Sequence, residues 1–221
     1  MRKVALNTFV TLDGVMQAPG GRDEDREGGF AHGGWSVSYW DEPMGETIVE
    51  WTQRAGALLL GRKTYEIFVA HWPKVTDEDP VAAKLNSVRK YVASRTLRDV
   101  TWNNATLIKG DLAEAVRRLK QEPGDEIQVH GSGELIQTLL RDGLVDEIRL
   151  WVFPVVLGSG KRLFADGAIP SALKLVSSRS SSTGVTINTY EAAGAIPYGT
   201  FEVDAEGRTE ALWRDGPAAT R

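Results

Sequence analysis

The residues best suited to chemistry form a short turn, Gly61-Arg62-Lys63-Thr64, which follows a continuous apolar run at residues 57–60. Such a run is typical of a strand buried on both faces, and the pattern after the turn predicts a helix. A helix start exposes unpaired N–H groups and the positive end of the helix dipole, and both favour a phosphate. Gly61 permits close approach, Arg62 and Lys63 add positive charge, and Thr64 offers a hydroxyl. The alternative is that both cations are only solvated at a helix start.

Two further strand ends carry residues of the same kind. Ser94 and Arg95 follow an expected strand at residues 90–93, at the position where ligands collect in open parallel sheets. The alternative there is an ordinary exit from strand to loop. The turn Gly131-Ser132-Gly133, with Glu134 and Leu135 after it, again joins a strand to a helix and lets the backbone reach a pyrophosphate. Ile136 breaks the full G-x-G-x-x-G fingerprint, so the three strand ends together are better evidence than any one alone.

Three residues elsewhere are candidates for the substrate side of such a site. Asp13 lies in the turn after the first expected strand, where it can bind a ribose or a ring N–H or can serve only as a turn former. Trp35 and Tyr39 can stack on a planar ring, although aromatic residues more often belong to a core, and the core interpretation is slightly favoured.

These residues require a sheet that brings several strand ends together. Short apolar runs alternate with helical patterns, which predicts an α/β fold with a mostly parallel central sheet flanked by helices. Asp41 and Asp111 are expected to cap two of the helices. After residue 145 helices become rare, which predicts an antiparallel C-terminal portion. The expected strands are at residues 3–10, 57–60, 90–93, 105–109, 127–130, 147–156, 172–178 and 185–192.

Two segments lack this patterning. Residues 19–34 contain six glycines among charged residues and are expected to form a mobile surface loop, which we interpret as an active-site lid in preference to plain disorder. Residues 1–195 are expected to form one domain, followed by a C-terminal tail at 196–221 that is poorly ordered from Asp204.

Composition excludes several classes of site. The formal net charge is −4, which does not resemble the basic footprint of a nucleic-acid binder. Without cysteine there is no disulfide, thiol nucleophile or thiolate metal site, and three scattered histidines make a metal site unexpected. No segment approaches the ~20 apolar residues of a membrane span, and the N-terminus has no signal-peptide pattern, so a cytoplasmic protein is expected.

In this order the motifs resemble the dihydrofolate reductase-like family, in particular the branch of the reductase domain of the riboflavin-biosynthesis deaminase/reductase. The resemblance covers about residues 1–193. The matching stretches are Thr11-Leu12-Asp13-Gly14-Val15, Gly61-Arg62-Lys63-Thr64-Tyr65-Glu66, Ser94-Arg95, the Gly131 turn with Leu135 and Ile136, and Pro154-Val155-Val156-Leu157-Gly158.

The resemblance implies that NADPH lies across the strand ends. Gly61 to Thr64 would hold phosphate groups, Ser94 and Arg95 would lie near the 2′-phosphate, and Gly131 to Leu135 would face the pyrophosphate. It also implies hydride transfer to a small nitrogen heterocycle or a ribosylaminopyrimidine, with Pro154 near the substrate and no need for a metal. This branch commonly forms homodimers through its sheet edge or C-terminal strands.

The chain departs from the family pattern at two positions. Dihydrofolate reductases hold the pterin with an acid on the helix before the Gly-Arg turn. The family spacing reaches Gly45 here, so Glu46 becomes the candidate acid. The riboflavin-pathway reductases have a substrate-contacting glutamate just before the glycine turn, where this chain has His130. The leading hypothesis is an NADPH-dependent reductase, and the alternative is a non-catalytic NADPH-binding module or sensor.

Overall fold

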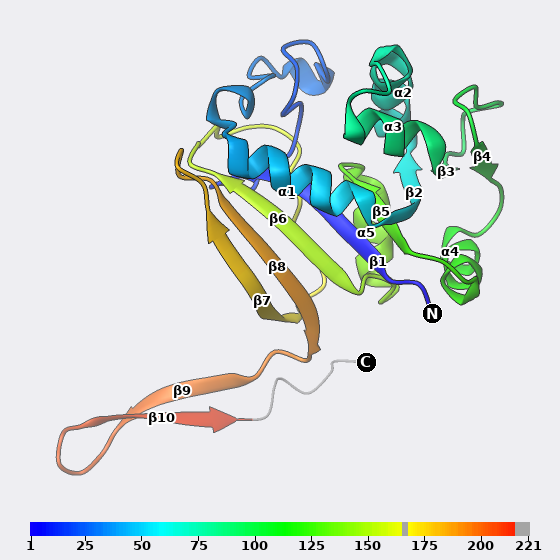
Figure 1. Ribbon diagram of the computed structural model, residues 1–221. Helices are drawn as coiled ribbons and strands as arrows, with labels where there is room; N and C mark the ends of the chain where they lie inside the picture. The colour runs from blue at the N-terminus through cyan, green and yellow to red at the C-terminus, as the bar shows by residue number, and fades with distance from the viewer. Residues whose placement is uncertain (165–167, 215–221) are drawn as a thin grey trace.

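The structure, a computed structural model, describes residues 1–164 and 168–214. Within these ranges the chain forms an eight-stranded sheet of order β4-β3-β2-β5-β1-β6-β8-β7 and a separate hairpin, β9–β10 (Figure 1). Strands β1 to β6 pair in parallel, β8 pairs antiparallel with β6, and β7 pairs antiparallel with β8. The prediction of a mostly parallel sheet with an antiparallel C-terminal portion is therefore confirmed. The eight strands are β1 Val4–Thr11, β2 Ala55–Gly61, β3 Arg89–Ala93, β4 Ala105–Ile108, β5 Glu126–His130, β6 Glu147–Phe153, β7 Ala172–Ser180 and β8 Thr186–Gly194.

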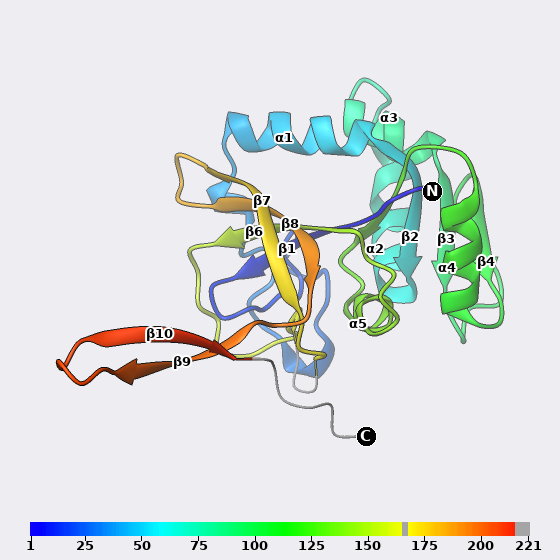
Figure 2. The same cartoon turned by 90° about the horizontal axis from the view of Figure 1, so that it is seen from below.

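Helices cover both faces of the sheet because the strands at its centre are apolar on both sides. Along β1, Leu6 and Val10 pack in one core cluster with α4 and α5, whereas Phe9 packs on the opposite side in a cluster that includes residues of α1. Figure 2 shows α1 and α5 on opposite sides of the sheet. The α-helices are α1 Glu42–Gln53, α2 Arg62–His71, α3 Pro80–Ser87, α4 Leu112–Gln121 and α5 Gly133–Arg141.

The helix N-termini fall into two groups. Asp41, Asp79 and Asp111 cap α1, α3 and α4 by accepting hydrogen bonds from first-turn amides, which confirms the two caps expected from the sequence. Helices α2 and α5 have Gly61 and Ser132 as their N-cap residues, and neither helix receives a side-chain cap. The first-turn amides of these two helices are therefore left for another partner.

The segment between β1 and α1 is folded against the body of the protein. It contains the short 3-10 helices η1 Glu27–Gly29 and η2 Val37–Tyr39. The buried Gln17 side chain donates to the carbonyls of Asp25 and Glu27 and accepts from the amide of Lys161. Gly33 packs so closely that a Cβ would lie 2.4 Å from the carbonyl oxygen of Arg22. Part of the expected surface loop at 19–34 is therefore packed against the rest of the protein. Its motion as a lid remains a prediction.

The C-terminal hairpin differs from the expectation. Strands β9 Tyr198–Val203 and β10 Thr209–Arg214 pair antiparallel and project from the body (Figure 1). In the turn, Asp204 accepts hydrogen bonds from the amides of Glu206 and Arg208, and Gly207 has a φ of 79°. The prediction of a poorly ordered tail from Asp204 is therefore wrong for residues up to 214. The Asp-x-x-Gly turn joins these residues into a hairpin. The remaining residues, 215–221, lie outside the described part of the chain.

Candidate functional site

The β2–α2 and β5–α5 turns interlock through Ser132. The Ser132 Oγ accepts a hydrogen bond from the Gly61 amide at 3.0 Å and lies 2.9 Å from the Thr64 Oγ1. It also lies 3.0 Å from the carbonyl oxygen of His130. Since β2 and β5 are neighbours, the sheet places the two turns side by side, and this hydroxyl fixes their spacing. The structure therefore brings together two of the three strand ends singled out from the sequence.

Backbone conformation at the second turn shapes the start of α5. Gly131 has a φ of 50° and Ser132 a φ of 61°, both in the left-handed region that favours glycine. A Cβ on Gly131 would lie 3.2 Å from the Thr64 Oγ1, so a side chain there would crowd the other turn. Leu135 is buried in the core, and Glu134 is exposed but carries a carboxylate that would repel a phosphate, so their backbone amides are the groups suited to such a ligand.

The cations of the β2–α2 turn are already paired with carboxylates. Arg62 lies 3.3 Å from Glu66 one helical turn later, and Lys63 lies 3.6 Å from Glu27 of η1. Lys161 contacts Glu27 as well, at 2.8 Å, and holds the pKa of that carboxyl below its ordinary value. These are exposed pairs of little net strength, so a phosphate can compete for both cations.

The end of β3 supplies a third element, since β3 is the other neighbour of β2 in the sheet. The Ser94 Oγ accepts hydrogen bonds from the amides of Thr96 and Leu97, so it shapes the loop after the strand. Arg95 is exposed next to it. The structure supports a turn-forming role for Ser94 and leaves Arg95 exposed two residues after Ala93, the register partner of Gly61.

Asp13 is held by protein groups on nearly every side. Its carboxylate accepts from the Thr11 hydroxyl at 2.6 Å and from the amides of Leu157 and Gly158. The Thr11 hydrogen bond is the main cause that lowers the pKa of Asp13 to about 2. Arg162 lies 3.5 Å away. These contacts tie the segment after β6 to the end of β1, which favours the turn-forming alternative for Asp13.

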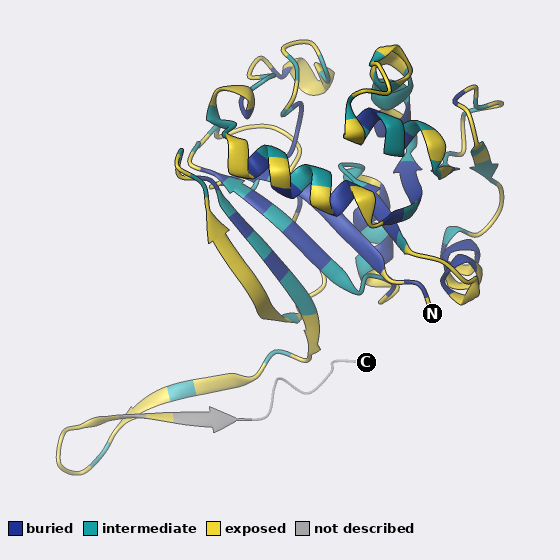
Figure 3. Cartoon of the chain, in the orientation of Figure 1, coloured by how far each residue is buried: buried dark blue, intermediate teal, exposed yellow. Residues whose placement is uncertain are grey.

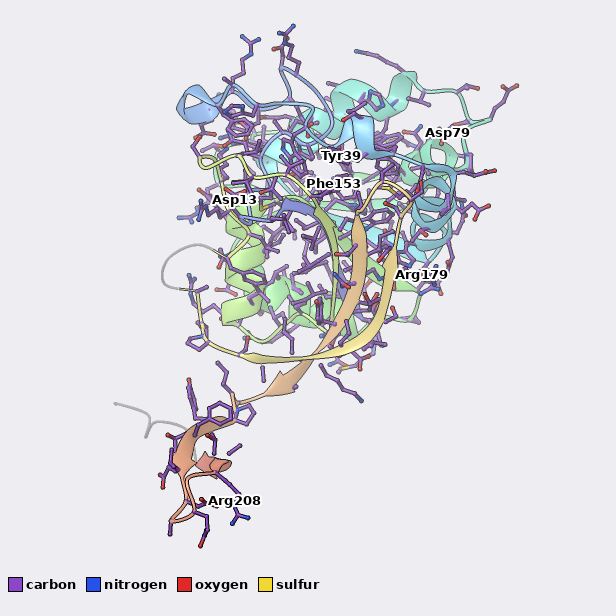
Figure 4. The ribbon with its side chains drawn as sticks, turned by 90° about the vertical axis from the view of Figure 1, so that its left-hand side faces the viewer. Asp13, Tyr39, Asp79, Phe153, Arg179 and Arg208 are labelled. Atoms are coloured by element: carbon purple, nitrogen blue, oxygen red, sulfur yellow. The ribbon has the colours of Figure 1, made fainter. Side chains whose placement is uncertain are left out.

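The aromatic candidates belong mainly to the core. Trp35 is buried, donates its Nε1–H to the Gln17 carbonyl at 2.7 Å, and packs edge-on against Phe153. Tyr39 packs on Phe153 too, with ring centroids 6.0 Å apart, and remains partly exposed (Figure 4). The core interpretation therefore fits Trp35, whereas Tyr39 and the exposed Pro154 stay within reach of a ligand at this end of the sheet.

Glu46 lies apart from these groups. It is exposed on α1 and lines a cavity with Arg179 and Ser180 at the end of β7. None of the residues that line this cavity belongs to the glycine turns. A substitution of Glu46 for the missing acid at Gly45 would need a shift of the helix, and the structure does not bring Glu46 together with Asp13 or the interlocked turns.

His130, the last residue of β5, stands beside a buried polar group that the sequence analysis missed. Its Nε2 lies 3.1 Å from the Gln128 Oε1, and burial lowers its pKa to about 4. Asn7 is its register partner on β1 and is only 6% exposed. The signal was available, because an asparagine interrupts the apolar run of the first strand, where a buried polar group needs a partner.

Comparison with known proteins identifies the family. A family model of the RibD C-terminal domain matches residues 2–187. The chain belongs to the RibD C-terminal domain family. This is the reductase-like domain of the riboflavin-biosynthesis deaminase/reductase, so the family resemblance found in the sequence is confirmed.

Individual relatives are similar in sequence or in fold. The chain is 36% identical over 189 residues to the uncharacterized protein YyaP of Bacillus subtilis strain 168, covering 83% of this chain and 92% of that protein. A provisionally assigned riboflavin biosynthesis protein of Shewanella sp. PV-4 has the same fold, with a TM-score of 0.65, 23% identity, and coverage of 87% and 99% of the two chains. The deaminase/5-amino-6-(5-phosphoribosylamino)uracil reductase of Thermotoga maritima superposes with a TM-score of 0.58 at 16% identity, over 87% of this chain and 57% of that one.

Two kinds of feature are absent from the described residues. No helix in residues 1–164 and 168–214 is long and apolar enough to cross a membrane. The same part of the chain has no cluster of three or more histidine or carboxylate side chains that could hold a metal ion.

Proposed function

We propose that this member of the RibD C-terminal domain family is an NADPH-dependent reductase. The observation that carries the proposal is the pair of uncapped helix N-termini, α2 and α5, held side by side by Ser132. The other three α-helices, α1, α3 and α4, have aspartate caps. Uncapped N-termini therefore occur where the two turns interlock. Two adjacent positive helix ends suit a dinucleotide pyrophosphate.

The surrounding residues fit the rest of such a cofactor. The amides of Gly133, Glu134 and Leu135 would bind the pyrophosphate, and Arg62, Lys63 and Thr64 would hold phosphate oxygens beside it. Arg95, with the loop shaped by Ser94, would meet the 2′-phosphate, since a guanidinium matches the geometry of a phosphate monoester. Gly61 and Gly131 keep the approach free of side chains.

The substrate proposal is a small nitrogen heterocycle or a ribosylaminopyrimidine. When bound, NADPH supplies the hydride, and the protein binds, orients and shields the acceptor. Asp13 is ionised at neutral pH and holds no proton to donate, and its hydrogen bonds to Thr11, Leu157 and Gly158 would shape the substrate side of the site. Tyr39, His130 and Pro154 would contact the ring, and the 19–34 segment, attached to Lys63 through Glu27, would exclude water.

A turnover assay tests this proposal. The protein is mixed with NADPH and either 5-amino-6-ribosylaminouracil phosphate or dihydrofolate, and absorbance of the reduced nicotinamide is followed. Oxidation that depends on one of these substrates supports the reductase. Binding of NADPH with no oxidation by either compound would favour the non-catalytic module or sensor.

We also propose that the protein acts in the cytoplasm as a homodimer. Cytoplasmic NADPH is the pool such a reductase draws on. One of the two edge strands of the sheet is β7, where Leu173, Leu175 and Val176 are exposed, and Figure 3 shows most of this strand as exposed. A long exposed apolar edge strand favours pairing with another chain. With a net charge of −4, nucleic acid is not proposed as a partner.

A further inference from the structure

An open cavity of about 660 Å³ lies at the end of the sheet opposite to the proposed cofactor site. Its lining includes Asn86, three residues before β3 begins, and residues 101–103, just before β4 begins. These positions are at the amino ends of two parallel strands, whereas the Gly61 and Gly131 turns follow the carboxyl ends of β2 and β5. The volume is typical of a small-molecule pocket, and none of the lining residues belongs to the glycine turns.

A buried ammonium lies directly behind the wall of this cavity. Lys90 is 0% exposed, and its Nζ donates to the carbonyl oxygens of Asn86 at 2.6 Å and of Asn103 at 3.0 Å, two residues that line the cavity. The same Nζ lies 4.5 Å from the ring centroid of Trp102, a third lining residue. Burial lowers the pKa of Lys90 to about 8, and no carboxylate of the described residues raises it, so the group remains mostly protonated at pH 7.

This enclosed charge dominates the electrostatics of the cavity. The lining contains two other charged side chains, Lys74 and Asp77, which are both exposed and opposite in sign. Water and salt screen exposed charges much more than buried ones. Buried charges in proteins ordinarily have a partner of opposite charge, and the described part of the chain gives Lys90 only carbonyl oxygens and an aromatic ring. An anion in the cavity would supply the missing counter-charge.

The rest of the lining suits an apolar molecule and is held in place by hydrogen bonds. Trp102 is only 5% exposed, and its Nε1 donates to the Asn86 Oδ1 at 2.9 Å. The Asn86 Nδ2 donates in turn to the Trp72 carbonyl at 3.1 Å, so the wall is preformed. The apolar lining residues besides Trp102 are Val69, Pro73 and Val75.

Tyr65 connects this wall to the start of α2. The Tyr65 side chain is buried, and its hydroxyl oxygen accepts hydrogen bonds from the amides of Thr101 at 2.7 Å and Trp102 at 3.2 Å. In the chain Tyr65 follows Thr64, whose Oγ1 lies 2.9 Å from the Ser132 Oγ. A ligand that shifts residues 101–102 therefore acts on the turn that is proposed to hold the cofactor.

We propose that this cavity is a regulatory site for a small organic monoanion, an apolar molecule that carries one carboxylate, and that its occupancy reaches α2 through Tyr65. One negative charge matches the one enclosed ammonium, and the apolar lining takes the body of the molecule. Binding of the anion is independent of the proposed reductase function. Only the regulated property, the affinity for NADPH, rests on that function.

A charged probe and its neutral analogue test the site. Benzoate and benzamide are titrated into the ¹⁵N-labelled protein, and the Trp102 Nε1–H resonance is followed. Benzoate is expected to bind at least tenfold more tightly than benzamide and to shift this resonance. Equal binding of the two compounds, or no shift of the Trp102 resonance by benzoate, would overturn the proposal.

Variants of the wall test the role of its charge. Lys90→Met is expected to weaken benzoate at least tenfold with benzamide unchanged, and its melting curve shows whether the variant folds. Asn103→Asp keeps Lys90 but adds a carboxylate to the lining, so it should weaken benzoate to a similar extent. Thr106→Asp is the matched control, because Thr106 is exposed on β4 outside the lining. Wild-type benzoate affinity in Asn103→Asp would refute the electrostatic basis of the site.

The coupling is measured at the other end of the connection. Benzoate should shift the amide resonances of residues 62–64 in the wild type but not in Tyr65→Phe, which keeps the ring and removes the hydroxyl. Saturating benzoate should also change the affinity for NADPH at least twofold in the wild type and leave it unchanged in Tyr65→Phe. Unmoved amides, or an unchanged affinity for NADPH in the wild type, would overturn the regulatory role. A protein that shows the amide shifts but binds no NADPH would count against the reductase proposal instead.

Discussion

At the scale of single residues, His130 combines a partly buried position with a titratable ring. Burial is the largest cause of its lowered pKa, with Arg149 adding to the effect, and the folded-state pKa is about 4 against an ordinary value of 6.5. The folded chain therefore keeps the ring neutral where the unfolded chain begins to protonate. The stability contributed by this difference is complete above pH 6.5 and is lost as the pH falls toward 4.

His130→Gln should remove that pH dependence. Between pH 6.5 and 4 the wild type should lose ~2–3 kcal/mol more of its free energy of unfolding than the variant does. Urea denaturation at a series of pH values measures both curves. Parallel curves for the two proteins would show that His130 is protonated in the folded state as readily as in the unfolded one.

At the scale of elements, two glycines differ in whether their surroundings leave room for a side chain. Gly45 lies in α1, and a Cβ there meets no atom within 4 Å. Gly160 has a φ of 125°, and a Cβ there would lie 2.7 Å from Val15 and 2.8 Å from Phe30. Helix propensity governs the first position, and packing and backbone strain govern the second.

Alanine substitution separates these effects. Gly45→Ala should stabilise the protein by ~0.5–1 kcal/mol, because it improves helix propensity without a clash. Gly160→Ala should destabilise it by ~1–3 kcal/mol, because the segment after β6 must move away from Phe30. Chemical denaturation gives both values. The account of the 154–163 segment fails if Gly160→Ala is as stable as the wild type.

Local signals explain why much of the fold was predictable from the sequence. Asp41 and Asp111 indicate helix starts because each side chain accepts a hydrogen bond from the amide three residues later. The Gly61 and Gly131 turns follow continuous apolar strands. Contacts between distant segments could not be predicted in this way. The saturation of Asp13 depends on amides at 157 and 158, and the burial of Trp35 depends on Phe153. Glu46 was chosen by counting along the chain, whereas Asn7 becomes evident only when the strand order places it beside His130.

At the scale of the whole molecule, the sheet ends in an exposed strand and the chain continues into a projecting hairpin. Leu175 on β7 is 52% exposed and Phe201 on β9 is 79% exposed. An isolated two-stranded hairpin is marginally stable in water, which favours contact of these surfaces with a second copy.

Leu175→Lys should therefore shift the protein from dimer to monomer, because a charge on an edge strand opposes strand pairing. Val37→Lys is the matched control, since Val37 is similarly exposed, at 56%, on η2. Size-exclusion chromatography with light scattering gives the mass of each protein. A monomeric wild type, or a dimeric Leu175→Lys variant, would contradict an interface along β7.

The proposed cofactor site is tested most directly by calorimetric titration of the whole protein with NADPH and with NADH. The interlocked helix ends and Arg95 predict saturable binding of NADPH that is at least ~10-fold tighter than that of NADH, a difference of about 1.4 kcal/mol. Arg95→Ala should reduce this preference, while Arg98→Ala, an exposed arginine in the same loop, should preserve it. Absence of binding at millimolar NADPH, or equal affinity for the two nucleotides, would contradict the account.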